Sequence, residues 1–272
     1  MVTRRSVPPE VYDSAYLLSD NTEGYQEFRE GSLSFVKQLQ LDMLELEPGM
    51  TLLEVGMGRG EFLCHCAKRG ARVTGIDYSE ASLEIGRKTL RDVPDADLRC
   101  ADSRDLPFED DSFDRVYAGD VLEHMDLEDG VVMLREMVRV ARPGGSIFVH
   151  TAPNAVFMKY VYPLLRPLLK RIDPNTVKTL ERHLEVNRAV HVHEYSLFSL
   201  RKVAARAGLV GAEIWIGEDI LRSSRHRHTA TLSQHPLVRL VRRFQRLGVV
   251  RFFLGNDLFL RMRKADREPA RQ

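Results

Sequence analysis

Short apolar runs and amphipathic segments alternate along the middle of the chain. The apolar runs, each bounded by turn residues and short enough to be a buried strand, lie near 51–55, 72–77, 97–101, 113–118 and 145–151. The segments whose apolar positions have helical spacing lie near 59–69, 80–92 and 127–141. Strands that alternate with helices form a parallel sheet covered on both faces, so the pattern predicts an α/β fold.

Further elements are expected on both sides of this core. Before it, a broken helical period over 22–46 predicts one N-terminal helix, which ends at Pro48-Gly49. After it, the pattern predicts a helix at 196–207 and strands at 210–217 and 255–264. We therefore divide the chain into an N-terminal helical cap and one domain with two helical inserts, with the bounds 1–48, 49–272, 154–190 and 218–254.

A glycine-rich loop follows the first predicted strand. Residues 52–62 read LLEVGMGRGEF and place Gly56, Gly58 and Gly60 directly after an apolar run. Glycines let a backbone loop approach a ligand where a side chain would collide. The next apolar run ends in Asp77, whose carboxylate is placed to accept both hydroxyls of a ribose. Strand, glycine loop, helix, strand and acid together indicate a nucleoside-binding crevice.

Three details narrow the choice of nucleoside. Glu61 stands where the dinucleotide motif has its third glycine, and Glu54 precedes the loop. A carboxylate at that place would repel a pyrophosphate but suits a cationic ligand. S-adenosylmethionine (SAM) carries a sulfonium and an ammonium and no phosphate. Asp102 follows the third predicted strand, where it can reach an adenine amino group.

Four successive segments resemble the motifs of class I SAM-dependent methyltransferases, in particular the small-molecule branch that includes the quinone-biosynthesis enzymes. These segments read LLEVGMGRGEF, GIDYSEASLEIGR, ADSRDLPFEDDSFDRVYAGDVLEHM and LREMVRVARPGGSIFVHTAPN, and they run from about residue 50 to 152. A weaker similarity covers 191–209. The resemblance implies a Rossmann-like, seven-stranded, mostly parallel sheet with an antiparallel last strand. Met57 departs from the small residue or cysteine that is common in the family.

The resemblance also implies roles for individual residues. Glu54 and the backbone of Gly56, Gly58 and Gly60 would hold the methionine end of SAM. Asp77 would bind the ribose, and Tyr78 would lie against the adenine. The remaining implied contacts are Asp102 and the Ser103 amide at the adenine amino group, and Asp120 at the methionine end.

Methyl transfer from SAM is an in-line displacement, so the enzyme mainly aligns donor and acceptor, and a hydroxyl acceptor also needs a base. His124, in GDVLEHM after the fourth strand, faces the expected methyl position by family analogy. His191 and His193 are two apart in an extended segment and point the same way. We name His124, His193 and His191 as candidate catalytic residues. The alternatives are that HVHEYS caps the next helix, with Ser196 as N-cap, or that His191 and His193 bind a metal ion, although no metal is expected.

The two inserts suggest what kind of acceptor is bound. The segment 154–190 is too long for a connecting loop, and its many aromatic and aliphatic residues predict a lid over a substrate with apolar bulk. In 236–247, apolar residues line one helical face and arginines the other. Such a helix can lie on an anionic membrane surface, attract a phosphorylated substrate, or simply pack its apolar face on the domain. We expect a small-molecule acceptor, with a lipid-linked substrate and peripheral membrane contact as options.

Composition sets the outer bounds. The 272 residues are 43% hydrophobic, enough for one sizeable core. Three cysteines without metal-ligand spacing indicate neither a disulfide framework nor a zinc site. Neither a signal peptide nor a membrane-spanning apolar run is recognised, so a cytoplasmic location is expected. The net charge of +1 conceals a basic segment, 222–272, with thirteen Arg or Lys and three acids, which indicates a local role for charge.

Alternative functions remain open from the sequence. A nucleotide-dependent oxidoreductase is disfavoured by Glu61 and by the lack of a Tyr-x-x-x-Lys pair near a helix. A non-catalytic SAM-binding subunit is disfavoured by the intact set of glycines and acids. GDVLEH lacks the Pro-Pro motif of amino-group DNA methyltransferases, so no DNA partner is expected. An RNA partner is disfavoured but remains an alternative. We favour a hydroxyl acceptor, such as a partly apolar metabolite, a lipid-linked sugar or a quinone-like ring, over carbon or nitrogen methylation.

Overall fold

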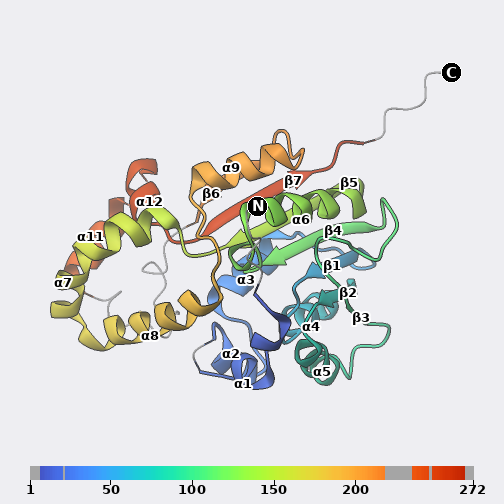
Figure 1. The fold of residues 1–272 in the computed structure, drawn as a ribbon, viewed down its shortest axis with the longest axis horizontal. Coiled ribbons are helices and arrows are strands. Elements are labelled where there is room, and N and C mark those ends of the chain that lie inside the picture. Colours follow the sequence, from blue (N-terminus) through green and yellow to red (C-terminus); the bar gives the residue numbers. More distant parts are fainter. Residues whose placement is uncertain (1–6, 21, 218–234, 245–246, 267–272) are drawn as a thin grey trace.

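A seven-stranded sheet forms the centre of the molecule in the computed structural model, which describes residues 7–20, 22–217, 235–244 and 247–266 (Figure 1). The strand order is β3-β2-β1-β4-β5-β7-β6. The strands are β1 (Thr51–Val55), β2 (Arg72–Asp77), β3 (Asp97–Cys100), β4 (Phe113–Gly119), β5 (Ala141–Thr151), β6 (Glu213–Ile216) and β7 (Leu258–Arg263). The pairs from β3 to β5 are parallel, and β7 is antiparallel to both β5 and β6. The expected Rossmann-like architecture, with an antiparallel last strand, is confirmed.

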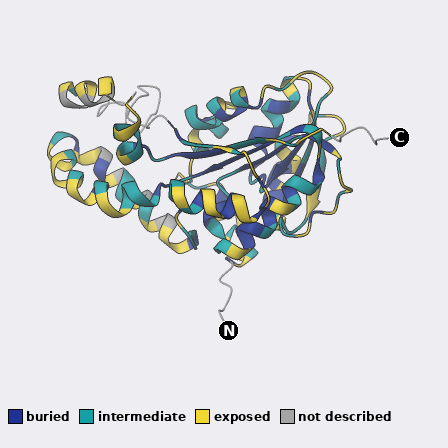
Figure 2. Ribbon diagram, turned by 90° about the horizontal axis from the view of Figure 1, so that it is seen from above, coloured by how far each residue is buried: buried dark blue, intermediate teal, exposed yellow. Residues whose placement is uncertain are grey.

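Helices cover both faces of the sheet because side chains on each strand point alternately to opposite sides. On one face, Leu52 packs with residues of α3, α4 and α5, and on the other, Leu53 packs with residues of α6 and α9. These helices are α3 (Phe35–Met43), α4 (Glu61–Lys68), α5 (Glu80–Thr89), α6 (Leu127–Val140) and α9 (Leu197–Arg206). The strands between them are the most buried part of the fold (Figure 2). Ser196 caps α9 in a capping box with Ser199, as one alternative for HVHEYS predicted.

The N-terminal region differs from the expected single helix over 22–46. It contains a 3₁₀ turn, η1 (Pro9–Val11), and the short helices α1 (Ser14–Leu17) and α2 (Tyr25–Arg29) ahead of α3. The break between α2 and α3 has a local cause. Gly31 has a left-handed φ of 71°, and the Ser34 side chain accepts a hydrogen bond from the Lys37 amide, which starts a new helix.

Strand β5 is longer than expected because the Pro143-Gly144-Gly145 segment lies within it. Ala141 pairs with Phe113, whereas the next pair is Ser146 with Arg115. The extra residues on the β5 side form a bulge, and Gly144 has a φ of 73° there. Pro143-Gly144-Gly145 is therefore an irregularity inside the strand and not a turn that precedes it. In contrast, β6 is shorter than the predicted strand over 210–217.

A helical lobe lies beside the edge of the sheet at which β4 ends (Figure 1). It comprises the π-helical turn η3 (Phe157–Val161), α7 (Tyr162–Ile172), α8 (Pro174–Val190), α11 (Pro236–Phe244) and α12 (Gly248–Leu254). Several apolar side chains of α7 and α11 are exposed, and Leu164 is 80% accessible. Of the predicted inserts, 218–234 and 245–246 lie outside the described residues. Within the ranges described, no helix has the length and hydropathy needed to cross a membrane.

Gly75 in β2 lies where α4 packs so closely on the strand that no room is left for a side chain. A Cβ at this position would lie 2.5 Å from Leu63 Cδ1 and 2.7 Å from Met57 Sδ. We expect Gly75→Ala to lower the free energy of unfolding by about 1–3 kcal/mol through overpacking, as measured by urea denaturation. The control is Gly248→Ala, where no atom of the described residues lies within 4 Å of the new Cβ and a change of about 0.5 kcal/mol or less is expected. Equal effects of the two substitutions would contradict this account.

Candidate active site

A cavity of about 490 Å³ opens at the carboxyl ends of the parallel strands. This is where ligands bind in open α/β sheets, and the volume is in the range of small-molecule sites. Its lining comes from the glycine loop, the ends of β2, β4 and β5, the N-terminal cap and the helical lobe. Ten of the twelve sequence-predicted site residues line it: Glu54, Gly56, Gly58, Asp77, Tyr78, Asp102, Ser103, Asp120, His124 and His191. Gly60 and His193 do not belong to the lining.

The glycine loop and Asp77 are locked together by backbone hydrogen bonds. The Gly58 amide donates to Asp77 Oδ2 at 3.0 Å, and the Ser79 amide donates to Asp77 Oδ1 at 2.9 Å. A Cβ on Gly56 would lie 2.5 Å from Val121 Cγ2, so the loop passes the β4 turn where only glycine fits. Gly60, with a φ of 75°, instead occupies the N-cap of α4. Burial raises the pKa of Asp77, against the two amides that lower it.

Glu54, at the end of β1, is a buried carboxylate with spare capacity. It is 5% exposed, and among the described residues its Oε2 atom has no hydrogen-bond partner. Burial raises its pKa well above the usual value, and the Lys37 ammonium only partly opposes this. A buried carboxylate oxygen is costly without a partner. The site therefore fits a ligand that brings a positive charge or a donor to this point.

Asp102 and its neighbours Ser103 and Arg104 line another part of the cavity. Arg104 binds Asp102 through both ends, from Nε to Oδ1 at 2.9 Å and from Nη2 to Oδ2 at 2.5 Å. These hydrogen bonds lower the pKa of Asp102 and keep it ionised. Tyr78 is 38% exposed and donates through its hydroxyl to the Val7 carbonyl at 3.2 Å. Both residues line the cavity, and Arg104, which was not anticipated from the sequence, lines it with them.

Asp120 belongs to a chain of charges at the ends of β4, β5 and β7. His150 Nδ1 lies 2.8 Å from Asp120 Oδ1, and His150 Nε2 lies 3.1 Å from Asp257 Oδ1. Burial alone would lower the pKa of His150, but the two carboxylates outweigh it and raise the pKa well above normal. The pKa of Asp120 is lowered in return, although burial opposes this. Asp120 also has a left-handed φ of 57°, which turns the chain sharply after β4.

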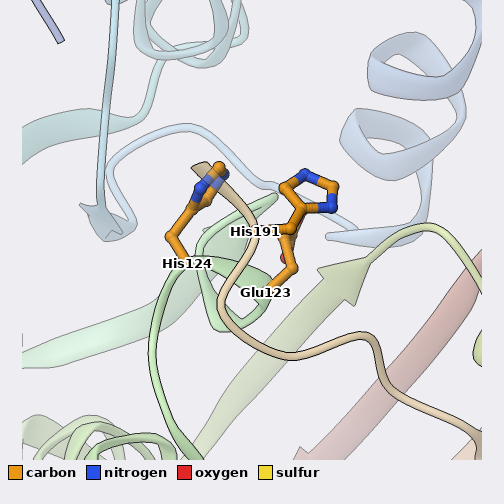
Figure 3. A group of neighbouring side chains, drawn as sticks. All are labelled: Glu123, His124 and His191. Atoms are coloured by element: carbon orange, nitrogen blue, oxygen red, sulfur yellow. The ribbon is translucent and has the colours of Figure 1, made fainter. Parts of the chain in front are cut away.

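Glu123, His124 and His191 form a compact polar cluster in the cavity (Figure 3). Glu123 and His124 lie on the short helix η2 (Leu122–His124), and His191 follows α8. Burial and the nearby Asp120 carboxylate raise the pKa of Glu123 to about 8, and Glu123 Oε2 accepts a hydrogen bond from Thr151 at 2.7 Å. Burial lowers the pKa of His124, and burial with the nearby His124 lowers the pKa of His191 to about 4. Both histidines are thus neutral at pH 7.

The two histidines of HVHEYS do not act as a pair. His191 lines the cavity, whereas the ring of His193 packs edge-on against Tyr195, with centroids 4.8 Å apart. The backbone explains the separation, because the amides of Val192 and His193 both donate to the Glu123 carbonyl, at 2.8 and 3.1 Å. The segment is therefore not a regular strand, and the expectation that the two side chains point the same way is wrong.

Part of this chain is similar in sequence to known proteins. Residues 53–149 match the family model described as a methyltransferase domain. A demethylmenaquinone methyltransferase of Staphylococcus aureus (strain MRSA252) is 33% identical over 148 residues, which make up 50% of this chain and 60% of that protein. The chain thus spans less than two thirds of this curated relative.

Solved structures share the fold of this methyltransferase domain. A Haloferax volcanii methyltransferase, crystallised with the Trm112 activator, has a TM-score of 0.62 at 19% identity, covering 96% of this chain and 100% of that chain. Phosphoethanolamine N-methyltransferase 2 of Haemonchus contortus, in complex with SAM, has a TM-score of 0.55 at 15% identity, covering 95% of this chain and 57% of that chain. At these identities the similarity concerns the fold.

Arg59 fastens the N-terminal cap over the cavity. This buried guanidinium donates to the Leu17 carbonyl at 3.0 Å, to Thr22 Oγ1 at 3.0 Å and to the Glu23 carbonyl at 2.7 Å. It also pairs with Glu61 at 2.9 Å, and Lys37 pairs with the same carboxylate at 2.6 Å. Burial alone would raise the pKa of Glu61, but the two cations outweigh it and lower the pKa to about 2.

Several residues of the site were missed by sequence reasoning. Glu123 directly precedes a named candidate, and His150 ends the fifth predicted strand, so the rule that singled out Asp77 also applies to His150. Arg59 stands between two loop glycines, yet its partners are about forty residues earlier, and no local pattern connects them. Tyr12 contacts His124 Nδ1 through its hydroxyl at 2.8 Å, and no local pattern connects two residues so far apart in the sequence.

Arg59→Met tests how the cap is held. The substitution removes the donors for the Leu17 and Glu23 carbonyls and leaves Glu61 paired with Lys37. We expect the cap to open more easily by about 2 kcal/mol, which corresponds to roughly 30-fold faster amide hydrogen exchange over residues 14–29. The control is Arg91→Met, because Arg91 is exposed and pairs with the equally exposed Asp92, away from the cap. Unchanged exchange in the Arg59 variant would rule out this fastening role.

Proposed function

We propose that this protein transfers a methyl group from SAM to a small, partly apolar acceptor, with a hydroxyl oxygen as the receiving atom. The observation that carries the proposal is one continuous cavity that contains both the Glu54–glycine loop–Asp77 set and the Glu123–His124–His191 cluster. The first set suits a cationic nucleoside, and the second suits a group that loses a proton. Two such sets in one cavity allow donor and acceptor to meet.

The proposed cofactor contacts follow from the polar groups on the cavity wall. Glu54, with its free carboxylate oxygen, and the backbone of Gly56 and Gly58 would hold the methionine end. Asp77 would accept the ribose hydroxyls, as its buried carboxylate is already oriented by two amides. The other proposed contacts are Tyr78, Asp102 and Ser103 at the adenine and Asp120 at the methionine end. SAM supplies a methyl group activated by its sulfonium.

His124 is the proposed base. Its Nδ1 atom lies 3.1 Å from the Val190 carbonyl oxygen, and a carbonyl oxygen can only accept a hydrogen bond. Nδ1 therefore carries the proton, and Nε2 keeps the lone pair that can take a proton from an acceptor hydroxyl. The lowered pKa of His124 keeps this lone pair free at neutral pH. His191 is the second candidate, and His193 is not retained because it lies outside the cavity lining.

The lobe side of the cavity supports an acceptor with apolar bulk. Leu165 and Leu169 of α7 and Leu180 and Leu184 of α8 line it. The relative named demethylmenaquinone methyltransferase is consistent with a quinone-like acceptor. Carbon or nitrogen methylation is the alternative to a hydroxyl acceptor. Leu164, Leu240 and Phe244 are exposed on the outside of the lobe, beside Arg239 and Arg243. Contact of this surface with a membrane would bring a lipid-borne acceptor to the cavity.

The competing functions receive less support from the same geometry. A dinucleotide-dependent oxidoreductase would need the third motif position to be small, but Glu61 is buried there and bound to Lys37 and Arg59. A non-catalytic SAM-binding protein would not need the Glu123–His124–His191 cluster in its cavity. The proposal therefore stays with an enzyme acting on a small molecule.

Asp77→Ala tests the cofactor half of the proposal. Loss of a carboxylate that accepts two ribose hydroxyls should weaken SAM binding by about 2–3 kcal/mol, or roughly 30- to 150-fold, measured by isothermal titration calorimetry. Asp92→Ala, at an exposed acid, is the control and should bind SAM like the wild type. Thermal unfolding of both variants shows whether they are folded. Wild-type affinity in a folded Asp77 variant would refute the assignment.

The acceptor half is tested by supplying methyl-labelled SAM and an extract of the source cells, then partitioning the products. Label in the organic phase, absent with Asp77→Ala, is the expected result, because four leucines of the lobe line the cavity. Label only in the aqueous phase would replace the apolar acceptor with a soluble sugar or metabolite. No labelled product from either phase would refute methyl transfer to a small molecule.

A further inference from the structure

Three side chains from two distant segments converge in the wall of the cavity. Glu123 and His124 come from η2, and His191 comes from the segment after α8 (Figure 3). One potential ligand atom from each of the three lies within 4.8 Å of the others. The rings of His124 and His191 are perpendicular, with centroids 5.1 Å apart, so the two imidazoles do not stack.

We infer that Glu123, His124 and His191 form a binding site for a divalent transition-metal ion. Two imidazoles and one carboxylate are a donor set that suits ions such as Zn²⁺, Fe²⁺, Co²⁺ or Mn²⁺, whereas Mg²⁺ prefers oxygen ligands alone. Such ions bind these donors at about 2.0–2.2 Å, so small side-chain rotations complete the site. Three protein ligands leave coordination positions open toward the cavity.

The groups behind the three ligands are arranged as a metal site requires. A metal-binding histidine usually donates its second ring N–H to a carbonyl or carboxylate, which fixes its tautomer. The Nδ1–H of His124 faces the Val190 carbonyl at 3.1 Å, which leaves Nε2 as the donor atom for an ion. Thr151 Oγ1 holds one carboxylate oxygen of Glu123 at 2.7 Å. Both ligands of η2 are therefore oriented before any ion binds.

His191 supports the metal site independently of the distances among the three side chains. Among the described residues its Nδ1 atom is buried and has no hydrogen-bond partner. The amides of Val192 and His193 donate to the Glu123 carbonyl at 2.8 and 3.1 Å, so His191 is held next to Glu123 by backbone contacts. A buried, unpaired ring nitrogen is unfavourable unless a ligand completes it. An ion bound by this nitrogen would satisfy it.

The role of this ion toward an acceptor rests on the proposed methyl transfer, whereas ion binding itself does not. An acceptor hydroxyl that occupies an open position on the ion would lose its proton to solvent more easily, because a bound cation stabilises the oxyanion. The oxygen would then bind as an anion and attack the methyl group. In the ion-bound protein His124 is a ligand, and direct proton transfer to His124 applies to the ion-free protein.

The test uses the full chain without a polyhistidine tag, stripped of metal with a chelator. We expect one Co²⁺ per chain, seen as visible absorption bands, and one Zn²⁺ per chain by calorimetry, both without SAM. His191→Ala and Glu123→Gln should each weaken binding at least about ten-fold. The matched control is His193→Ala, two residues along the same segment and outside the cluster, which should bind the ions like the wild type.

The possible outcomes separate this inference from the proposed function. Absence of stoichiometric binding in wild type, or equal binding in folded His191→Ala, would overturn the metal site while SAM binding stays intact. Asp77→Ala is expected to lose SAM affinity and keep the metal ion, because Asp77 is not one of the three ligands. Thermal unfolding of each stripped variant shows that it is folded. Loss of binding only in the His193 variant would move the site elsewhere and also overturn the assignment.

Discussion

The central strand β1 is enclosed on both edges and on both faces, and this constraint decides where the chain can hold polar chemistry. β1 is hydrogen-bonded in parallel to β2 and β4, and its side chains enter two separate apolar clusters. A strand enclosed in this way leaves only its ends for ligands. The carboxyl ends of neighbouring parallel strands meet at one edge, so Glu54, Asp77, Asp120 and His150 come together although they are far apart in sequence.

The acidic side chains gathered at this edge of the sheet are each stabilised by different neighbouring groups. Asp77 is neutralised by backbone amides of its own loop and Asp120 by the His150 ring. Arg104 holds Asp102 through two parallel hydrogen bonds. Glu54 Oε2 has no hydrogen-bond partner among the described residues, and the Thr151 hydroxyl and the His150 charge only partly offset the burial of Glu123. The two undercompensated carboxylates therefore mark the two points at which ligands would add charge or donors.

The sequence predicted the order of strands and helices in the central sheet and most of the residues that line the glycine-loop side of the cavity. Asp77 and the loop glycines follow from local order along the chain, since each stands directly after a short apolar run. The acceptor side depends on tertiary contacts instead. His191 is beside Glu123 only because two amides after it bind the Glu123 carbonyl, and no spacing in the sequence encodes that contact. Likewise, the helical period over 22–46 predicted one helix across Gly31, but the left-handed backbone at this glycine breaks it.

Tyr12 connects the two halves of the cavity, the one around Asp77 and the one around His124. Its carbonyl accepts a hydrogen bond from Ser79 Oγ at 2.7 Å, next to Asp77, while its hydroxyl contacts His124 Nδ1 at 2.8 Å. One residue of the cap thus touches the cofactor side and the acceptor side. A first ligand that orders Tyr12 leaves less conformational entropy for the second ligand to remove. Thermodynamic linkage then requires each ligand to strengthen the binding of the other by the same factor.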